Sequence, residues 1–349
     1  MTVWLVRAGA HGEHESRFLQ EKRVFLTFNG LDVDLKNLTS RSALSQKLGE
    51  LSPEAKDKTL QTWVSQFWPF AADMAIGDLV ITPLKAQRKI QVGEITGGYE
   101  FMPQGPNPYY HSRKVNWIGE SIPRSNFGKD LLNSFGAFLT ICRIEKNNAE
   151  QRIKAMRLNN WQPETITAIL TPNMGAQTPD GSNVADTDPI DLEEAGLDQI
   201  ARVIDAKFKQ HDFTRLIEGI LKAQGYTTYR SPEGADGGAD ILAGSGPFGF
   251  GSPRLCVEVK SEANPIDRPS VDKLMGAVTK FGAQEGLFVS WSGFKTNVQK
   301  ELAASFFRVR LWSQTEILDA LFEVYDRLDE ELKAELPLKR IWTVAIPED

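Results

Sequence analysis

The sequence predicts a two-domain α/β protein (α+β overall), in which a small β-barrel with helices is followed by a mixed sheet flanked by helices. Three observations support this prediction. The length of 349 residues exceeds what one ordinary core covers. The first part alternates short apolar strands with Gly/Pro-containing turns. The last part is predicted to run helix, three strands, helix, strand, helix, strand, which implies helices on both faces of a mixed sheet.

The composition is that of a soluble globular protein, with 41% hydrophobic and 25% charged residues. No apolar run approaches the roughly 18 residues that a membrane span needs. The N-terminus, "MTVWLVRAGAHGEHE", lacks the long apolar stretch of a signal peptide. Cys142 and Cys256 lie in apolar, strand-like stretches, so we expect reduced core thiols and no disulfide. The expected location is the cytoplasm, with no membrane partner.

The charge is distributed unevenly along the chain. Residues 1–160 hold 21 Lys/Arg against 16 Asp/Glu, and the remainder holds 19 against 30. The stretch 178–198, "TPDGSNVADTDPIDLEEAGLD", carries seven acids and no base. This pattern predicts a basic domain over 1–160, a solvated acidic linker over 161–198, and a second domain over 199–349 that ends in a helical extension.

Helical spacing of apolar residues over 199–224 predicts two helices broken near Gln210–Asp212, with Asp212 as an N-cap and Gly225 ending the second helix. The stretch "SGPFGFGSP" has the composition of a hairpin turn. Further strands are expected at 226–230, 239–244, 254–260, 286–292 and 308–313, and further helices at 270–283 and 296–307.

The strand "RLCVEVK" ends in two charges. Because side chains alternate between faces, Glu258 and Lys260 share one face, while Val257 and Val259 share the other. Asp240 follows the Gly-rich loop "SPEGADGG" and begins a strand that we expect to pair with this one. Two carboxylates at close range repel unless a cation lies between them, and hard oxygen ligands suit Mg²⁺. A lysine beside such a metal can orient or help deprotonate an attacking water.

These stretches carry a resemblance to a known family. "FTRLIEGILKAQGY", "GADGGADI" and "CVEVKS", followed by "LMGAVTKFGAQEGLFVSWSGF" and "VRLW", resemble in order and spacing the PD-(D/E)xK nuclease fold, and most closely the Mrr-type catalytic domain of restriction endonucleases. The resemblance covers roughly residues 211–320. It implies that Asp240 and Glu258 bind Mg²⁺, with Mn²⁺ as a substitute, that the Val259 carbonyl oxygen is a further ligand, and that Lys260 is the catalytic lysine.

The chain departs from that family at two points. Many members have Gln where this chain has Glu258, which is the metal-binding acid of the wider superfamily. Members often carry an acid directly after the helix phenylalanine, where this chain has Thr214. Glu218, one turn later, is either an auxiliary ligand or a surface acid. Asp236 either joins the metal site or caps its loop.

The N-terminal part resembles a different group. "GDLVITPLKAQRKIQVGEITGGYEF", with "HSRKVNWIG" after it, resembles strands of PUA-like barrels such as the EVE, YTH and ASCH readers. The resemblance implies a pocket in which aromatic side chains hold a base, often a modified one. The candidates for base binding are Trp68, Tyr99 and Trp117. His111, Arg113 and Lys114 are either phosphate-binding residues or solvated strand charges.

Together these features predict a Mg²⁺-dependent DNA endonuclease that hydrolyses phosphodiester bonds, in modification-dependent (type IV-like) restriction of foreign DNA. The partner is then double-stranded DNA. A homodimer or higher homo-oligomer is expected, because cutting both strands needs two active sites. One alternative is a DNA repair or recombination nuclease. Another is a reader of modified bases in DNA or RNA whose nuclease domain is idle, against which the intact Asp240, Glu258 and Lys260 argue.

Overall fold

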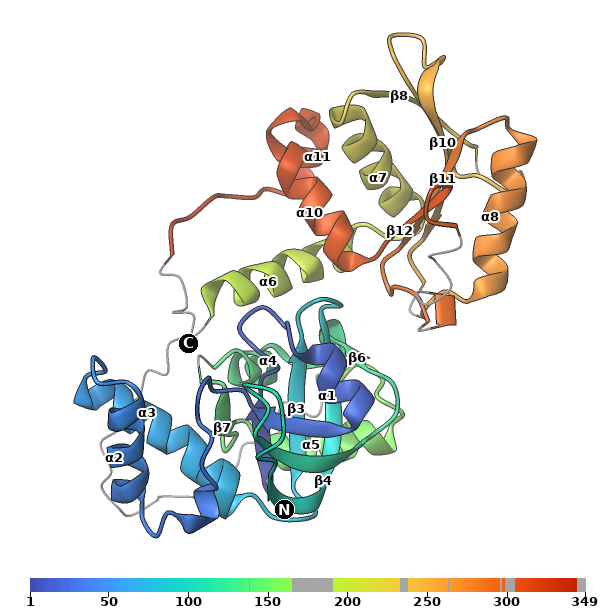
Figure 1. Ribbon diagram of the computed structural model, residues 1–349. Helices are drawn as coiled ribbons and strands as arrows, with labels where there is room; N and C mark the ends of the chain where they lie inside the picture. Colours follow the sequence, from blue (N-terminus) through green and yellow to red (C-terminus); the bar gives the residue numbers. More distant parts are fainter. Residues whose placement is uncertain are drawn as a thin grey trace. The chain divides into compact units, whose positions relative to one another are not determined.

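The computed structural model of the chain (Figure 1) describes residues 1–137, 139–164, 191–232, 238–262, 264–295, 297–298 and 305–343. Two compact units are present: Met1–Gly196 belong to the first and Leu197–Trp342 to the second. Most of the expected acidic linker, residues 165–190, lies outside the described residues. None of the helices in the described ranges has the length and apolar character that a membrane crossing requires.

The first unit contains a seven-stranded mixed sheet in the order β2-β5-β4-β3-β1-β7, with β6 paired to β4. β1 and β3 run parallel, and the other described pairs are antiparallel. Strands form in both apolar parts of "GDLVITPLKAQRKIQVGEITGGYEF" and at "HSRKVNW", as the sequence predicts. The strands of the sheet are β1 (Val3–Val6), β2 (Arg23–Leu26), β3 (Leu79–Leu84), β4 (Lys89–Phe101), β5 (His111–Trp117), β6 (Ile122–Pro123) and β7 (Ile141–Arg143).

This sheet is open and buried on both faces. Along β1, Trp4 and Val6 enter one apolar cluster while Val3 and Leu5 enter another. Alternate residues therefore face two separate cores, as in a central layer covered by helices on both sides. The described pairings end at β2 and β7, which do not pair with each other. The expectation of a closed small barrel is wrong for these residues, because closure requires the two end strands to pair around one interior.

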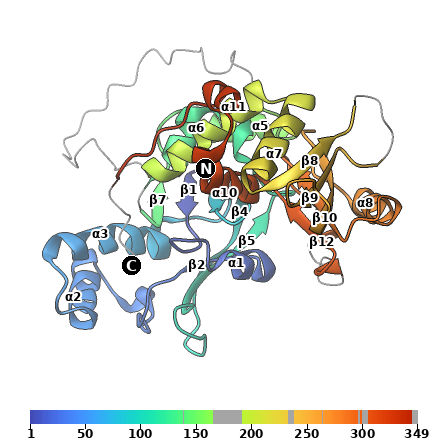
Figure 2. The ribbon, with the colours of Figure 1, turned by 90° about the horizontal axis from the view of Figure 1, so that it is seen from above.

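Helices cover the two faces of the first sheet. The cluster around Trp4 includes side chains of the first three helices, and the cluster around Leu5 includes those of the next two. The side chain of Ser40 accepts a hydrogen bond from the Ala43 amide and begins α2, which lies beside α3 in Figures 1 and 2. The helices are α1 (Glu15–Glu21), α2 (Arg41–Leu51), α3 (Asp57–Trp68), α4 (Lys129–Phe135) and α5 (Ala149–Leu158), with the short turns η1 (Leu35–Asn37), η2 (Pro69–Asp73) and η3 (Arg124–Asn126).

The second unit contains a five-stranded mixed sheet in the order β12-β11-β10-β9-β8. β8, β9 and β10 are antiparallel, and β10, β11 and β12 are parallel. The predicted mixed α/β sheet with its hairpin is therefore confirmed. The strands are β8 (Tyr226–Arg230), β9 (Ile241–Ser245), β10 (Gly251–Lys260), β11 (Glu285–Ser290) and β12 (Val309–Trp312).

Helices lie on both faces of this second sheet. One face packs with α7 and α10 through Val257 and Val259, and the other packs with α8 through Cys256 and Phe288 (Figure 1). Ser313 and Glu316 form a reciprocal cap that begins α10. The helices are α7 (His211–Ala223), α8 (Arg268–Lys280), α10 (Gln314–Val324) and α11 (Glu330–Glu335), with the turn η6 (Tyr325–Arg327). A further helix, α6 (Leu192–Lys207), begins within the residues of the first unit and ends within those of the second.

The break between the first two helices lies where the sequence placed it, but α7 begins at His211, so Asp212 lies in its first turn and is not the N-cap. Gly225 follows α7 with a φ of +98°, a conformation that favours glycine at a helix end. The helix expected over 296–307 falls largely outside the described residues.

Candidate active site

Glu258 and Lys260 lie at the C-terminal end of β10, the central strand of the second sheet. The Lys260 Nζ atom is 2.7 Å from Glu258 Oε1. Val257 and Val259 alternate with these charges and enter the apolar cluster on the α7 face. Glu258 and Lys260 therefore lie on the other face, which is that of Cys256. A charge pair in the middle of a sheet, half-buried on one face, differs from the solvated edge-strand pair that an isolated acid and lysine would usually form.

Asp240 is held against the same end of β10. Its backbone amide donates to the Val257 carbonyl at 2.8 Å, and its Oδ2 atom accepts a hydrogen bond of 2.7 Å from the Val259 amide. The hairpin between β9 and β10 therefore brings Asp240 beside residues that are 17 or more positions away in the chain. The structure thus gathers the three residues that the sequence singled out, Asp240, Glu258 and Lys260.

Glu258 and Asp240 lie close enough to Lys260 and Cys256 to shift the pKa of both groups. Burial alone would lower the pKa of Lys260, but its hydrogen bond to Glu258 and the charges of Glu258 and Asp240 raise that pKa above its ordinary value. Burial and the same two carboxylates raise the pKa of the Cys256 thiol to about 12. Lys260 is therefore a charged ammonium at neutral pH, and the surroundings of Cys256 and Lys260 are rich in negative charge. Neither Cys142 nor Cys256 is in a disulfide, and Cys256 is buried.

The oxygen atoms at this site fit a hard divalent cation. Glu258 Oε1 faces Lys260 and Asp240 Oδ2 faces the Val259 amide, which leaves the second oxygen of each carboxylate without a partner among the described residues. Mg²⁺ binds through one or two carboxylates together with waters and substrate phosphate. Clusters of three or more His, Cys, Asp or Glu side chains that could hold a metal do not occur in the described part of the chain. The site of Asp240 and Glu258 has two acidic side chains and so falls below that number.

Glu218 lies elsewhere. It is buried on α7, where Thr228 Oγ1 donates to it at 2.8 Å and where Lys222 and Arg230 lie within 3.0 and 3.6 Å. Burial would raise its pKa, but these partners lower it below its ordinary value. Because α7 packs on the opposite face of the sheet from Cys256, Glu218 joins α7 to β8 and is not beside Glu258. Asp236, the other uncertain acid, lies outside the described residues.

Two serines form hydrogen bonds next to the charged residues of the site. Ser231 Oγ donates to the Ala239 carbonyl at 2.7 Å, one residue before Asp240. Ser261 Oγ accepts from the Gln210 amide at 3.0 Å, one residue after Lys260. These bonds fix the chain on both sides of the charged residues. The available signal in the sequence was a small hydroxyl residue directly next to each strand end.

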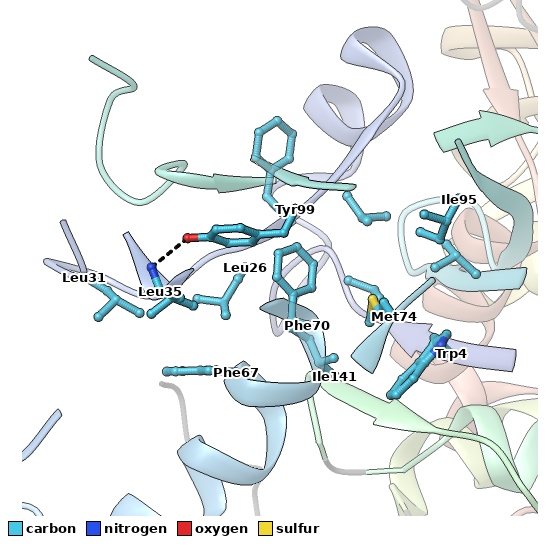
Figure 3. Close-up of a cluster of buried hydrophobic side chains, with 14 of the residues drawn as sticks. Trp4, Leu26, Leu31, Leu35, Phe67, Phe70, Met74, Ile95, Tyr99 and Ile141 are labelled. Atoms are coloured by element: carbon cyan, nitrogen blue, oxygen red, sulfur yellow. Dashed lines mark hydrogen bonds between the residues drawn. The ribbon is translucent and has the colours of Figure 1, made fainter. Parts of the chain in front are cut away.

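The aromatic candidates of the first unit occupy different environments. Tyr99 is buried inside the cluster around Trp4, where its hydroxyl accepts a hydrogen bond of 3.1 Å from the Leu35 amide (Figure 3). The same hydroxyl lies 2.7 Å from His111 Nδ1. Its ring is consequently part of the core, which argues against stacking on a base. Trp68 and Trp117 are half-buried at the margin of the same cluster, and the Trp117 indole donates to the Phe18 carbonyl at 3.2 Å.

The basic candidates on β5 also differ in burial. His111 is fully buried between Tyr99 and the Leu31 carbonyl, and burial lowers its pKa to about 4. Arg113 is buried as well and donates to the carbonyls of Phe70 and Ala71 at 2.6 and 3.0 Å. Burial lowers the pKa of Arg113 to about 10. Both side chains therefore tie the strand to the segments packed on it, which argues against contact with a phosphate.

Lys114 points the other way on β5. It is exposed and lies 3.3 Å from Glu100 on the neighbouring strand. It is the one of the three basic candidates on β5 whose charged group is accessible to a phosphate.

Comparison with known families assigns the second unit. Residues 205–321 match the Mrr_cat family, which is described as a restriction endonuclease. These residues form a restriction endonuclease domain. The endonuclease domain contains α7, all five strands of the second sheet and α8, and with them Asp240, Glu258 and Lys260. The resemblance drawn from the sequence for this part of the chain is confirmed, and nuclease action on DNA follows from the family.

The first unit matches a second family. Residues 4–133 match DUF8426, a domain of unknown function. This match does not confirm the PUA-like resemblance. No curated protein matches the chain.

Three solved structures show weak similarity to the chain. AspBHI, a DNA modification-dependent restriction endonuclease, is 16% identical with a TM-score of 0.32, over 81% of this chain and 74% of that one. MspJI restriction endonuclease, in complex with a 27-mer oligonucleotide, is 13% identical with a TM-score of 0.30, over 75% and 64%. AF1548, a protein of unknown function, is 13% identical with a TM-score of 0.26, over 35% and 77%. Scores this low carry no argument about the chemistry of the site.

Proposed function

We propose that the chain is a Mg²⁺-dependent DNA endonuclease that acts in modification-dependent restriction of foreign DNA. The observation that carries the metal-dependent chemistry is the position of Asp240, whose carboxylate is hydrogen-bonded to the amide between Glu258 and Lys260. Mn²⁺ is the expected substitute for Mg²⁺. We place the protein in the cytoplasm, where it meets entering DNA.

The roles of the three residues follow from their chemistry. Asp240, Glu258 and the Val259 carbonyl oxygen would hold the cation, which supplies positive charge to a phosphate that gains negative charge in the transition state. Lys260, a charged ammonium held by Glu258, orients the attacking water through a donated hydrogen bond and offsets charge on the phosphate. The Val259 amide orients the Asp240 carboxylate. Cys256 is buried with a raised pKa and has no part in the reaction.

The proposal is tested by digestion of plasmid DNA. Unmodified plasmid and plasmids that carry defined base modifications are incubated with the full chain in Mg²⁺, Mn²⁺ or EDTA. We expect cleavage with either metal, none in EDTA, and faster cleavage of at least one modified plasmid. Cleavage in EDTA at the rate seen with Mg²⁺ would contradict the metal site. Equal rates on all plasmids would contradict the dependence on modification and favour a repair or recombination nuclease.

The first unit is the part that we propose to sense the DNA. Its support is the basic charge of residues 1–160 and the two half-buried rings of Trp68 and Trp117. Stacking on a base contributes about 1–3 kcal/mol. Trp68→Ala or Trp117→Ala should therefore lower the ratio of cleavage rates on modified and plain plasmid by about tenfold or more. Cleavage of plain plasmid at high protein and low salt should persist. An unchanged ratio in both variants would remove the base-reading role from these rings.

A single active site cuts one strand at a time, so cleavage of both DNA strands in one binding event calls for two active sites. We propose a homodimer or higher homo-oligomer as the active form. Sedimentation of the full chain with and without DNA tests this point, and a monomer that cuts both strands in one binding event would contradict it.

A further inference from the structure

Part of the second sheet's α8 face is exposed next to the catalytic residues. α8 packs against β10 and β11, through the cluster that contains Cys256 and Phe288. β8 lies at the edge of the sheet, and its Tyr229 side chain is 58% exposed. A large aromatic side chain on a strand usually packs against a neighbour. Tyr229 is consequently a surface aromatic on an otherwise well-packed sheet.

The strand register places Tyr229 on the catalytic face. Tyr229 pairs with Leu242, and Leu242 pairs with Cys256. Paired residues in a sheet point to the same face, so Tyr229 shares the face of Cys256 and, two residues further along β10, of Glu258. Two strand spacings across and two residues along correspond to about 12 Å between the Cα atoms of Tyr229 and Glu258. Because a DNA duplex of several base pairs is longer than this distance, a substrate bound at Glu258 can extend to Tyr229.

The β9–β10 hairpin marks the far end of the same face. Gly244 pairs with Thr227 and Arg254 in the next row of the sheet, and a Cβ atom at Gly244 would lie 2.0 Å from the Gly249 carbonyl oxygen. The tip of the hairpin therefore folds over this row, and Thr227 Oγ1 holds it by donating to the Gly246 carbonyl at 2.8 Å. In Figure 1 the hairpin extends beyond the ends of α7 and α8.

The tip carries two exposed phenylalanines. Phe248 and Phe250 are 78% and 85% exposed, and their rings are stacked with centroids 6.3 Å apart. The exposed Arg254 lies in the same row as Gly244, between this tip and Cys256. The exposed part of the face thus carries a tyrosine, an arginine and an aromatic tip. Phosphates and bases bind side chains of these kinds.

We propose that this exposed surface, made of Tyr229, Arg254, Phe248 and Phe250, binds the DNA that flanks the scissile phosphate, with Tyr229 as the positioning residue nearest the catalytic groups. The inference rests on the proposed nuclease function and goes beyond it by naming the substrate contacts. DNA is the occupant because Tyr229 lies on the face of the sheet that carries Glu258, which the substrate must reach. Arg254 supplies the positive charge that a phosphate requires.

Site-specific photo-crosslinking of the full chain tests the contact directly. p-Benzoylphenylalanine replaces Tyr229, Phe250 or Phe307, in a Lys260→Ala background that prevents cleavage, and labelled duplex DNA is irradiated with each protein. Phe307 is the matched control because it is 88% exposed on the same unit but precedes β12, the opposite edge strand. We expect DNA crosslinks from positions 229 and 250 and at least tenfold less from position 307. No crosslink at 229, or equal crosslinking at 307, would overturn the inference.

Kinetics of the cleaving enzyme separate this inference from the proposed function. Tyr229→Ala and Arg254→Gln should each raise KM at least fivefold and change kcat less than threefold, while Phe307→Ser changes neither. Tyr229→Phe should restore most of the loss if the ring makes the contact. If both variants cleave with the wild-type KM, the proposed DNA-binding role of this surface is wrong and the proposed nuclease function still stands. Crosslinks at 229 and 250 from a chain that never cleaves would overturn the nuclease and leave the surface intact.

Discussion

The backbone amide of Val259 donates a hydrogen bond of 2.7 Å to the carboxylate of Asp240. This bond joins two strands at the point where Glu258 and Lys260 flank Val259 on the sequence. Asp240 therefore has two functions in this structure. Its oxygen satisfies a backbone donor at the end of a strand, and its charge adds to that of Glu258 next to Lys260.

These two functions of Asp240 can be separated by substitution. Asp240→Asn keeps an oxygen that can accept from Val259 but removes the charge, so cleavage should be lost while the melting temperature changes little. Asp240→Ala also leaves the Val259 amide without its acceptor, which should cost about 1–3 kcal/mol of unfolding free energy. Plasmid digestion and thermal unfolding measure both. Equal destabilisation by the two variants would show that the hydrogen bond contributes nothing.

Lys260 and Glu258 provide the test of the chemistry itself. Lys260→Ala should lower the cleavage rate by about 10²–10⁴-fold, the range typical of a group that assists proton transfer or charge stabilisation. The fold should persist, because Lys260 is half-exposed at the sheet end. Glu258→Gln should also abolish cleavage. It is a less decisive test, because many members of the family that the sequence resembles have glutamine at this position. Lys273→Ala on the exposed side of α8 is the control. Full activity of Lys260→Ala would remove the catalytic assignment.

Arg113 and Lys114 are neighbours that we expect to respond in opposite ways. Arg113→Met leaves the carbonyls of Phe70 and Ala71 without their donor and should cost about 2 kcal/mol or more of unfolding free energy. It should leave the salt dependence of DNA binding unchanged. Lys114→Ala should affect stability little and reduce the slope of log K against log salt by about 1. Thermal unfolding and DNA binding at several salt concentrations test the pair, and a lower slope in Arg113→Met alone would reverse these roles.

Glu15 should make the stability of the first unit depend on pH. Burial raises its pKa to about 7 from an ordinary value of 4.5, against the opposing hydrogen bond from the Lys85 amide. Between these two values the folded state holds a proton that the unfolded chain has released, so stability falls as pH rises from 4.5 to 7. The change is at most about 3 kcal/mol.

Glu15→Gln keeps the acceptor oxygen and removes the ionisation. The variant should therefore unfold at a higher temperature than wild type at pH 8 and show a smaller decrease between pH 5 and pH 8. Glu54→Gln, a change at an exposed glutamate, is the control and should follow wild type. If wild type gains stability over this range and Glu15→Gln does not, then Glu15 is ionised in the folded protein.

Much of the second unit could be predicted from local sequence. The alternation in "RLCVEVK" assigns Val257 and Val259 to one face and Glu258 and Lys260 to the other, and the structure has that arrangement. The Gly-rich stretch "SGPFGFGSP" predicts a hairpin that returns the chain antiparallel, which is sufficient to bring Asp240 near Glu258. Glu218 could not be placed in this way. Helical spacing gives its position on α7 but does not tell which face of a distant sheet the helix covers.

In the first unit, the local sequence pattern does not predict which polar residues are buried. The sequence of β5, "HSRKVNW", has the polar residues of a solvated strand, yet His111, Ser112 and Arg113 are buried. His111 and Arg113 are stable there because β5 lies between β2 and β4, beneath segments that supply carbonyl partners from Leu31, Phe70 and Ala71. Those partners are 40 or more residues away along the chain. A polar residue is stable in a core only when such partners are present, and the sequence around it does not reveal them.

The sequence by itself therefore predicted the mixed α/β fold class, the strands of the second unit, and the three residues Asp240, Glu258 and Lys260 that the structure brings together. These depend on side-chain periodicity and on turns of a few residues, which are local. Only the tertiary structure decided that the first sheet is open, that Tyr99, His111 and Arg113 belong to its core, and that Tyr229 shares the face of Glu258. Each of these depends on which distant strands pair and which helices cover them, because burial and strand pairing are set by contacts between residues far apart in the chain.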